Sequence, residues 1–241
     1  MKKIIGAMIR AIKDYKMIVE NDKVAVGLSG GKDSTALLCA LATYRKYAPF
    51  KFDIVGININ MGFDVDQTEE RKAYKEYVES LGVEYVEEKT DISTIIFDVR
   101  KEKSPCSLCS KMRRGALHTA AVKHGCNKVA LGHHADDVLG TMLLSFFYEG
   151  RLSTFSPVSY LDRTGLTLIR PFIYVDEKDI KGAVKRLNMP VLTNPCPEDK
   201  HTEREKMKEI VDYIKKKIPI ARDRMISAIE HPERYNLWRK P

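Results

Sequence analysis

The stretch Lys23–Ser34, KVAVGLSGGKDS, joins a short apolar run to a glycine-rich turn and the beginning of an apolar helical segment. Its first part, Lys23–Ser29, is rich in valine, which predicts a buried strand. The segment from residue 32 to about residue 47 is apolar at helical spacing and predicts a helix. Gly30 and Gly31 lie between them, where the backbone can approach a phosphate beside the unpaired N–H groups of a helix N-terminus. We therefore expect a phosphate-binding loop between a first strand and a first helix.

The sequence that follows repeats this alternation of strands and helices. Further strands are predicted over residues 53–60, 83–88 and 128–132, and further helices over 66–81 and 107–123. Strands that alternate with helices are typical of a parallel sheet with right-handed crossovers. The sequence therefore predicts an α/β fold with a Rossmann-like parallel sheet.

The chain changes character after Gly150, where prolines separate short segments and two further helices are predicted over 202–217 and 221–230. We expect three parts that form one packed domain. They are an N-terminal amphipathic helix (1–20), an α/β domain that includes a cysteine-bearing loop (21–195) and a helical C-terminal extension (196–241).

Composition points to a soluble cytoplasmic protein with a polyanionic partner. The chain has 241 residues, 44% of them hydrophobic, and a formal net charge of +8. A basic protein attracts nucleic acid through steering and counterion release. Arg10, Lys13 and Asp14 interrupt the apolar residues of the N-terminal segment, which argues against a signal peptide, and no segment has the apolar length of a membrane span. Five cysteines, an odd number, do not suggest a secreted disulfide framework.

The residues Ser29-Gly30-Gly31-Lys32-Asp33-Ser34 supply the polar groups of the expected phosphate loop. The serines add hydroxyl donors, Lys32 adds a positive charge, and Asp33 either binds Mg²⁺ or caps the helix. The spacing is not that of a Walker A motif. It is similar to the SGGxDS signature of the PP-loop ATPases, the N-type ATP pyrophosphatases. That resemblance implies that ATP is cleaved between its α and β phosphates to adenylate a substrate oxygen. The alternative is an ordinary glycine–serine turn capped by Asp33.

Three of the cysteines stand in segments that suit metal binding. Cys106 and Cys109 form a C-x2-C pair, and Cys196 lies between two prolines in Asn194-Pro195-Cys196-Pro197. Cys39 and Cys126 are interpreted as packing residues. Three thiolates can hold an iron–sulfur cluster that keeps one iron without a protein thiolate.

The rival interpretation of these cysteines is a structural zinc site. A histidine would complete the tetrahedral ligand set, and His118, His133 and His201 are the candidates. Spacing alone leaves both interpretations open.

A more specific resemblance rests on four motifs: SGGKDS, PCSLCSKMRRG, ALGHHADD and RPFIYVDEKDI. Together they resemble the tRNA 2-thiocytidine synthetases, the TtcA family, over about residues 24–196. The resemblance implies a [4Fe-4S] cluster on three cysteines and thiolation of cytidine 32 in tRNA. It places Cys106 and Cys109 as paired ligands and Cys196 as the third. One departure is that the family's third ligand often lies in a second C-x2-C-like segment, whereas Cys196 stands alone.

The motif Gly132-His133-His134-Ala135-Asp136-Asp137 follows the fourth predicted strand and opens a helix. Ligands of open α/β sheets bind beyond the carboxyl ends of strands, so this motif should face the same crevice as the phosphate loop. By resemblance, Gly132 lies against the nucleotide, and a carboxylate, Asp137 rather than Asp136, assists catalysis or holds Mg²⁺. Arg113 resembles a basic residue that contacts ATP. The alternatives are aspartates that only cap the helix and an arginine on a solvated helix face.

The sequence thus predicts an ATP-dependent tRNA sulfurtransferase, with Asp33, Arg113 and Asp137 as its catalytic residues. It would bind ATP, Mg²⁺ and tRNA, and a cysteine desulfurase or free sulfide would donate sulfur. Basic residues at 215–217, 222 and 224 are candidate tRNA contacts, and a homodimer is a further expectation taken from related enzymes. The alternatives are an adenylating ligase or small-molecule sulfurtransferase with structural Zn²⁺, and a non-catalytic metal or redox sensor.

Overall fold

The computed structural model of the chain describes residues 1–101, 105–198 and 203–238. Its strands are β1 (Lys23–Leu28), β2 (Asp53–Asn60), β3 (Glu84–Lys89), β4 (Lys128–Ala130), β5 (Val158–Leu161) and β6 (Leu166–Ile169). Its helices are α1 (Lys2–Asp14), α2 (Lys32–Arg45), α3 (Thr68–Ser80), α4 (Pro105–Lys123), α5 (Ala135–Glu149), α6 (Glu177–Arg186), α7 (Glu203–Lys217) and α8 (Ala221–Glu230), with a π-helical segment η1 (Thr94–Val99) and a 3-10 turn η2 (Pro232–Arg234).

The strands form one sheet in the order β3-β2-β1-β4-β6-β5. All neighbouring pairs are parallel except β5 and β6. The predicted α/β fold class is therefore confirmed, as are the four predicted strands. Strands β5 and β6 were not predicted from the sequence, because they have only four residues each and pair as an edge hairpin.

Helices cover both faces of the sheet. On one face, α4 packs Leu117 and Ala121 against sheet residues that include Ala25, Val55 and Val129, all of them buried. On the other face, α2 contacts β1 and β2, and a hydrogen bond between the Thr35 and Tyr74 hydroxyl groups (2.8 Å) links α2 to α3. Burial on both faces explains why β1 and β2 are almost continuously apolar.

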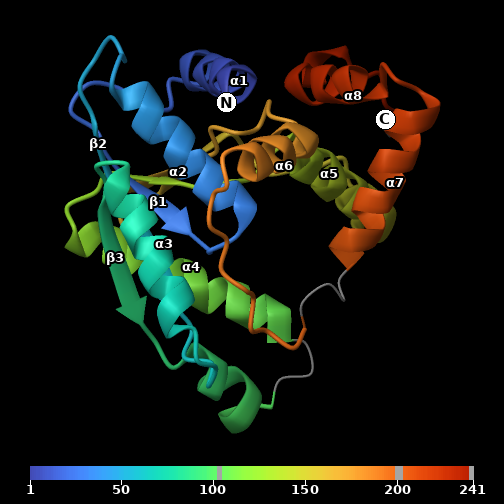
Figure 1. Cartoon of the computed structure of the whole chain (residues 1–241). Coiled ribbons are helices and arrows are strands. Elements are labelled where there is room, and N and C mark those ends of the chain that lie inside the picture. The colour runs from blue at the N-terminus through green and yellow to red at the C-terminus, as the bar shows by residue number, and fades with distance from the viewer. Residues whose placement is uncertain (102–104, 199–202, 239–241) are drawn as a thin grey trace. The chain divides into compact units, whose positions relative to one another are not determined.

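The strand order places the ends of β1 and β4 at a topological switch point. The chain leaves β1 through α2 towards β2, whereas β4 lies on the opposite side of β1. In such sheets the crevice beyond the carboxyl ends of the two strands is the usual ligand site. Figure 1 shows α2 beginning beside the end of β1, and the loop between them is the predicted phosphate loop.

The chain divides into two compact units. Unit 1 comprises residues 1–134 and 156–199, and unit 2 comprises residues 135–155 and 200–241. In unit 1, α1 buries its apolar side, including Ile5, Met8 and Ile12, and contacts α2 and α6. The N-terminal segment is thus an integral part of unit 1.

Unit 2 differs from the C-terminal extension that the sequence predicted. It also contains α5, which packs against α7 and α8. Lys215 of α7 forms an ion pair with Asp136 of α5, and the Asp136 side chain is only 7% exposed. The sequence predicted α5 as part of the α/β domain because the helix directly follows β4. In the structure, α5 instead makes its contacts with α7 and α8.

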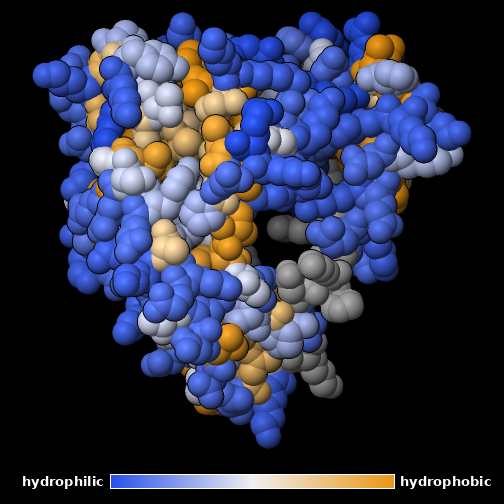
Figure 2. All heavy atoms as spheres, in the orientation of Figure 1, coloured by the Kyte–Doolittle hydropathy of each residue, from blue (hydrophilic) through white to orange (hydrophobic). Residues whose placement is uncertain are grey.

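The described residues contain no helix that is both long enough and apolar enough to span a membrane. The surface drawn in Figure 2 is mainly hydrophilic, and hydrophobic residues form only limited areas on it.

Candidate nucleotide and thiol site

The loop between β1 and α2 is held in shape by its own serine hydroxyl groups. Ser29 N donates to Ser34 Oγ (3.2 Å), Gly31 N donates to Ser29 Oγ (3.3 Å), and Ser34 Oγ donates to Gly31 O (3.0 Å). Gly31 is the N-cap residue of α2, and its position carries no side-chain cap hydrogen bond. The first turn of α2 therefore keeps the N–H groups and the positive end of the helix dipole that an anion would use.

Glycine is required at two positions around this loop. Gly30 has φ +80°, and a Cβ there would lie 2.7 Å from Leu192 Cβ. A Cβ on Gly132 would lie 3.0 to 3.1 Å from backbone atoms of Asp33 and Ser34. Gly132 thus allows the chain just after β4 to lie directly against the first turn of α2, beside the phosphate loop.

Lys32 projects from the loop into a small cluster of carboxylates. Its Nζ lies 3.0 Å from Asp33 Oδ2 and 2.9 Å from Glu177 Oε1. Burial lowers the pKa of Lys32, but the two carboxylates outweigh burial and raise it above its ordinary value. The side chain is therefore a cation across the physiological pH range. The sequence did not predict a role for Glu177, because nothing in its local sequence connects it with Lys32.

Asp33 presents one carboxylate oxygen that is buried without a hydrogen-bond partner. This atom, Oδ1, lies 3.8 Å from His134 Nε2 and accepts no hydrogen bond from the described residues. An unsatisfied carboxylate oxygen beside a phosphate loop fits the chemistry of a Mg²⁺ ligand.

The two aspartates of the second motif lie in unit 2, at the first turn of α5. Asp136 is buried and paired with Lys215, whereas Asp137 is half-buried. The ion pair gives Asp136 a structural role, which agrees with the preference for Asp137 as the acting carboxylate. The role of Asp137 stays a prediction.

Cys106 and Cys109 lie in the first turns of α4, and Cys196 lies in the loop after α6. Cys109 Sγ is 3.9 Å from Met61 Sδ. Burial raises the pKa of the Cys109 thiol; Arg113, one turn further along α4, opposes the rise, and the thiols of Cys196 and Cys106 add to it. Cys106, Cys196 and Arg113 therefore all lie close enough to Cys109 to influence the charge of its thiol.

Within the residues that the structure describes, no three or more His, Cys, Asp or Glu side chains form a group that could hold one metal ion. This finding applies to the three cysteines and equally to their combination with His118 or His133. The third predicted zinc candidate, His201, lies outside the described residues. A cluster binds its thiolates on different iron atoms, so its ligands are spaced more widely than the ligands of a single ion.

Comparison with known proteins shows the family of the chain. A family model described as a PP-loop domain matches residues 3–213. The tRNA-cytidine(32) 2-sulfurtransferase of Syntrophotalea carbinolica is 38% identical over 95% of this chain and 87% of its own length. The enzyme of that name from Geotalea uraniireducens is 39% identical over 96% of this chain and 92% of its own.

A solved structure shares the architecture as well. It is the U34-tRNA thiolase NcsA from Methanococcus maripaludis with its [4Fe-4S] cluster, and its TM-score is 0.77 at 25% identity. The match covers 96% of this chain and 79% of that one. The resemblance predicted from the sequence motifs is confirmed by these relatives.

Proposed function

Because the chain belongs to the PP-loop family and, within it, to the tRNA-cytidine(32) 2-sulfurtransferases, we propose that it is an ATP-dependent tRNA sulfurtransferase. It adenylates the C2 carbonyl oxygen of a pyrimidine, with cytidine 32 as the target base, and replaces that oxygen with sulfur. The observation that carries the proposal is a direct contact between the phosphate loop and the segment that leads to Cys196. Leu192 N, four residues before Cys196, donates to Gly30 O in the phosphate loop (2.9 Å).

The phosphate loop supplies the groups that adenylation needs. The N–H groups of the first turn of α2 and the Lys32 ammonium bind the triphosphate of ATP and stabilise negative charge as it develops. Asp33, whose buried Oδ1 accepts no hydrogen bond from the described residues, would hold Mg²⁺, which neutralises phosphate charge. The pyrimidine oxygen attacks the α phosphorus and pyrophosphate leaves. The oxygen then departs with AMP, a far better leaving group than oxide, when sulfide attacks C2.

The three cysteines supply the site for sulfur. Cys106, Cys109 and Cys196 would hold a [4Fe-4S] cluster, and thiolates are the ligands that such clusters use. Such a cluster, when bound, supplies an iron that has no protein thiolate and can receive sulfide. Arg113, close to Cys109, adds a fixed positive charge that attracts the anionic sulfide and the phosphates. Sulfide itself comes from a donor such as a cysteine desulfurase.

The tRNA partner is supported by charge as well as by the names of the relatives. The chain has a formal net charge of +8, and besides Lys215, which is paired with Asp136, the C-terminal helices carry basic residues at 216, 217, 222 and 224. Such residues bind the RNA backbone without reading sequence. A base in a single-stranded loop is already accessible, so extruding it costs little.

The experiment that tests this function combines tRNA mass spectrometry with cysteine variants. Purified protein, iron, sulfide, ATP and unmodified tRNA are expected to yield 2-thiocytidine together with pyrophosphate. Cys106→Ser and Cys196→Ser are expected to abolish thiolation, whereas Cys126→Ala, at a cysteine buried in the core under α4, should retain it. Thiolation by both serine variants at the wild-type rate would refute the cluster ligands. Release of pyrophosphate from ATP without formation of any thiolated nucleoside would instead favour an adenylating ligase.

A further inference from the structure

The segment that carries Cys196 is held between the phosphate loop and α3. Leu192 N donates to Gly30 O (2.9 Å), and Gln67 Nε2 donates to Thr193 O (2.6 Å). Thr193 N donates to Glu70 Oε2, and Thr193 Oγ1 donates to Glu70 Oε1, both at 3.0 Å. The three polar groups of Thr193 are thus satisfied by two side chains from the beginning of α3.

The segment that carries Cys196 also packs directly against the phosphate loop through Leu192. A Cβ on Gly30 would meet three side-chain atoms of Leu192 at 2.7 to 3.0 Å. Glycine at this position therefore does more than leave room for phosphate, because it also lets Leu192 pack onto the loop. Movement of Leu192 away from the loop would break this packing.

The chain between Thr193 and Cys196 transmits this fixed position to the thiol. Asn194 Oδ1 accepts a hydrogen bond from Cys196 N (3.2 Å), which closes a tight turn. Pro195 and Pro197 each fix one backbone dihedral on either side of the cysteine. With so few free torsions, the location of Cys196 depends on how firmly Thr193 is held.

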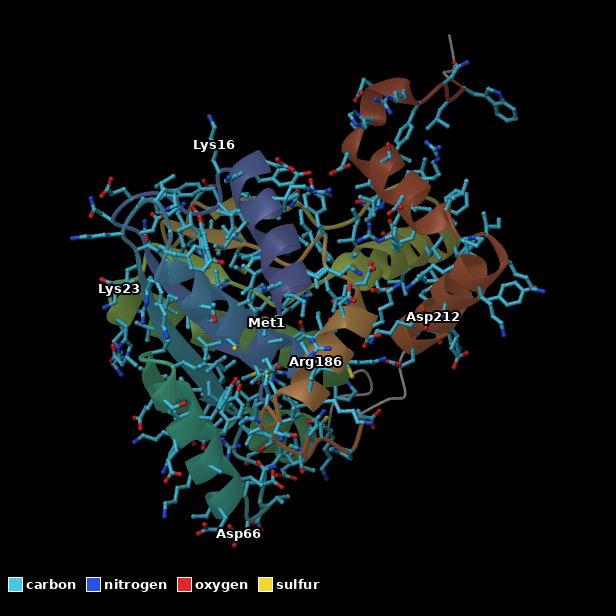
Figure 3. The ribbon with its side chains drawn as sticks, turned by 45° about the horizontal axis from the view of Figure 1, so that its top comes forward. Met1, Lys16, Lys23, Asp66, Arg186 and Asp212 are labelled. Carbon is cyan, nitrogen blue, oxygen red and sulfur yellow. The ribbon has the colours of Figure 1, made fainter. Side chains whose placement is uncertain are left out.

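We propose that Glu70 is a positioning residue that holds Cys196 in place for its role as a cluster ligand, by binding both Thr193 N and Thr193 Oγ1. The role of Cys196 as a cluster ligand rests on the proposed function, whereas the contact between Glu70 and Thr193 does not depend on it. Glu70 occupies the third position of α3, after the N-cap Gln67. Figure 3 labels Asp66 just before this first turn, at the end of α3 drawn lowest in that view.

The chain offers a matched control for Glu70. Glu69 is the neighbouring acidic residue in the same first turn of α3, and it is also exposed. Substituting either glutamate removes one carboxylate from the helix N-terminus, so both changes weaken the favourable interaction with the helix dipole alike. Of these two glutamates, it is Glu70 that hydrogen-bonds to Thr193. A difference between the two variants therefore reports the contact with the Cys196 segment.

The first test measures alkylation of the metal-free protein by mass spectrometry. Glu70→Ala is expected to speed the modification of Cys196 roughly ten-fold, the effect of losing a hydrogen bond to a charged group, while Cys106 reacts at its wild-type rate. Glu70→Gln keeps an oxygen that accepts from Thr193 N and should restore slow alkylation. Thr193→Val removes one of the two bonds and should give an intermediate rate. Wild-type alkylation of Cys196 in Glu70→Ala, or equal acceleration in Glu69→Ala, would overturn the proposal.

The second test separates this proposal from the proposed function. After anaerobic reconstitution with iron and sulfide, a chelator is expected to remove iron faster from Glu70→Ala than from Glu69→Ala or Glu70→Gln. If both alanine variants lose iron at the wild-type rate, Glu70 does not position a cluster ligand. If the wild-type chain takes up no cluster at all, the proposed function fails, and the alkylation rates still decide whether Glu70 holds Cys196.

Discussion

Replacing Gly30 with alanine tests the structural role of the phosphate loop directly. The residue has φ +80°, and its new Cβ would lie 2.7 Å from Leu192 Cβ and 2.8 Å from Leu192 Cδ1. The left-handed backbone costs an L-residue about 1–2 kcal/mol, and overpacking typically adds about 1–3 kcal/mol. The sum predicts a loss of about 2–5 kcal/mol in the free energy of unfolding. In a chain of this size the thermal midpoint should fall by roughly 4–20 °C.

Gly31→Ala is the matched control for this prediction. Gly31 has φ −79°, and a Cβ there would have only Ser29 Oγ as a neighbour, at 3.4 Å. Its stability should stay within about 1 kcal/mol of wild type. The added methyl group at the N-cap of α2 is expected to weaken ATP binding, because the N–H groups of this turn would bind phosphate. Urea unfolding followed by circular dichroism, and calorimetric titration with ATP, measure the two effects. Wild-type stability of Gly30→Ala, or a larger loss in Gly31→Ala, would refute the reasoning.

Three further predictions follow from the described contacts. Glu177→Gln removes a carboxylate 2.9 Å from Lys32 Nζ and is expected to tighten ATP binding by roughly two- to ten-fold; weaker binding in a calorimetric titration would contradict this. The pKa of His118 is lowered below 6.5, mainly by burial and to a lesser extent by two nearby arginines. The unfolded chain therefore binds a proton at a higher pH than the folded chain does, and stability falls as the pH drops below 6.5. His118→Gln should flatten the dependence of the urea midpoint on pH between 7.5 and 5, and an unchanged slope would disprove this contribution. Asp22→Ala leaves Lys128, whose side chain is 12% exposed and 3.0 Å from Asp22, without its carboxylate and should cost about 3–5 kcal/mol in urea unfolding; a loss below 1 kcal/mol would mean that water replaces the pair.

The parts of the molecule that local patterns decide were predicted with little error. The strand over 53–60 and the helix over 221–230 have the predicted ends, and the phosphate loop lies between β1 and α2 as expected. Buried parallel strands need continuous apolar residues, and a close turn needs glycine, so both leave a mark within a few positions of sequence. The C-x2-C spacing of Cys106 and Cys109 is also visible in the sequence, and the role of this pair as cluster ligands stays a prediction.

Elements whose stability comes from distant partners were not predicted. Neither β5 nor β6 has a strong pattern, since each has four residues and gains its hydrogen bonds only from the sheet. The helix α6 places Glu177 beside Lys32, yet neither residue's neighbours in sequence reveal the pair. The grouping of α5 with α7 and α8 also depends on contacts that no local period encodes.

The sequence by itself determined the chemistry: an anion-binding loop, three thiols and a basic surface are properties of residue type and short spacing. Only the tertiary structure decided how these groups depend on one another. Glu70 and Thr193 are 123 positions apart, and Leu192 reaches Gly30 only because the chain folds back over the end of β1. Local sequence constrains two dihedral angles per residue, but a hydrogen bond between distant segments exists only after packing of the whole unit has brought its donor and acceptor together.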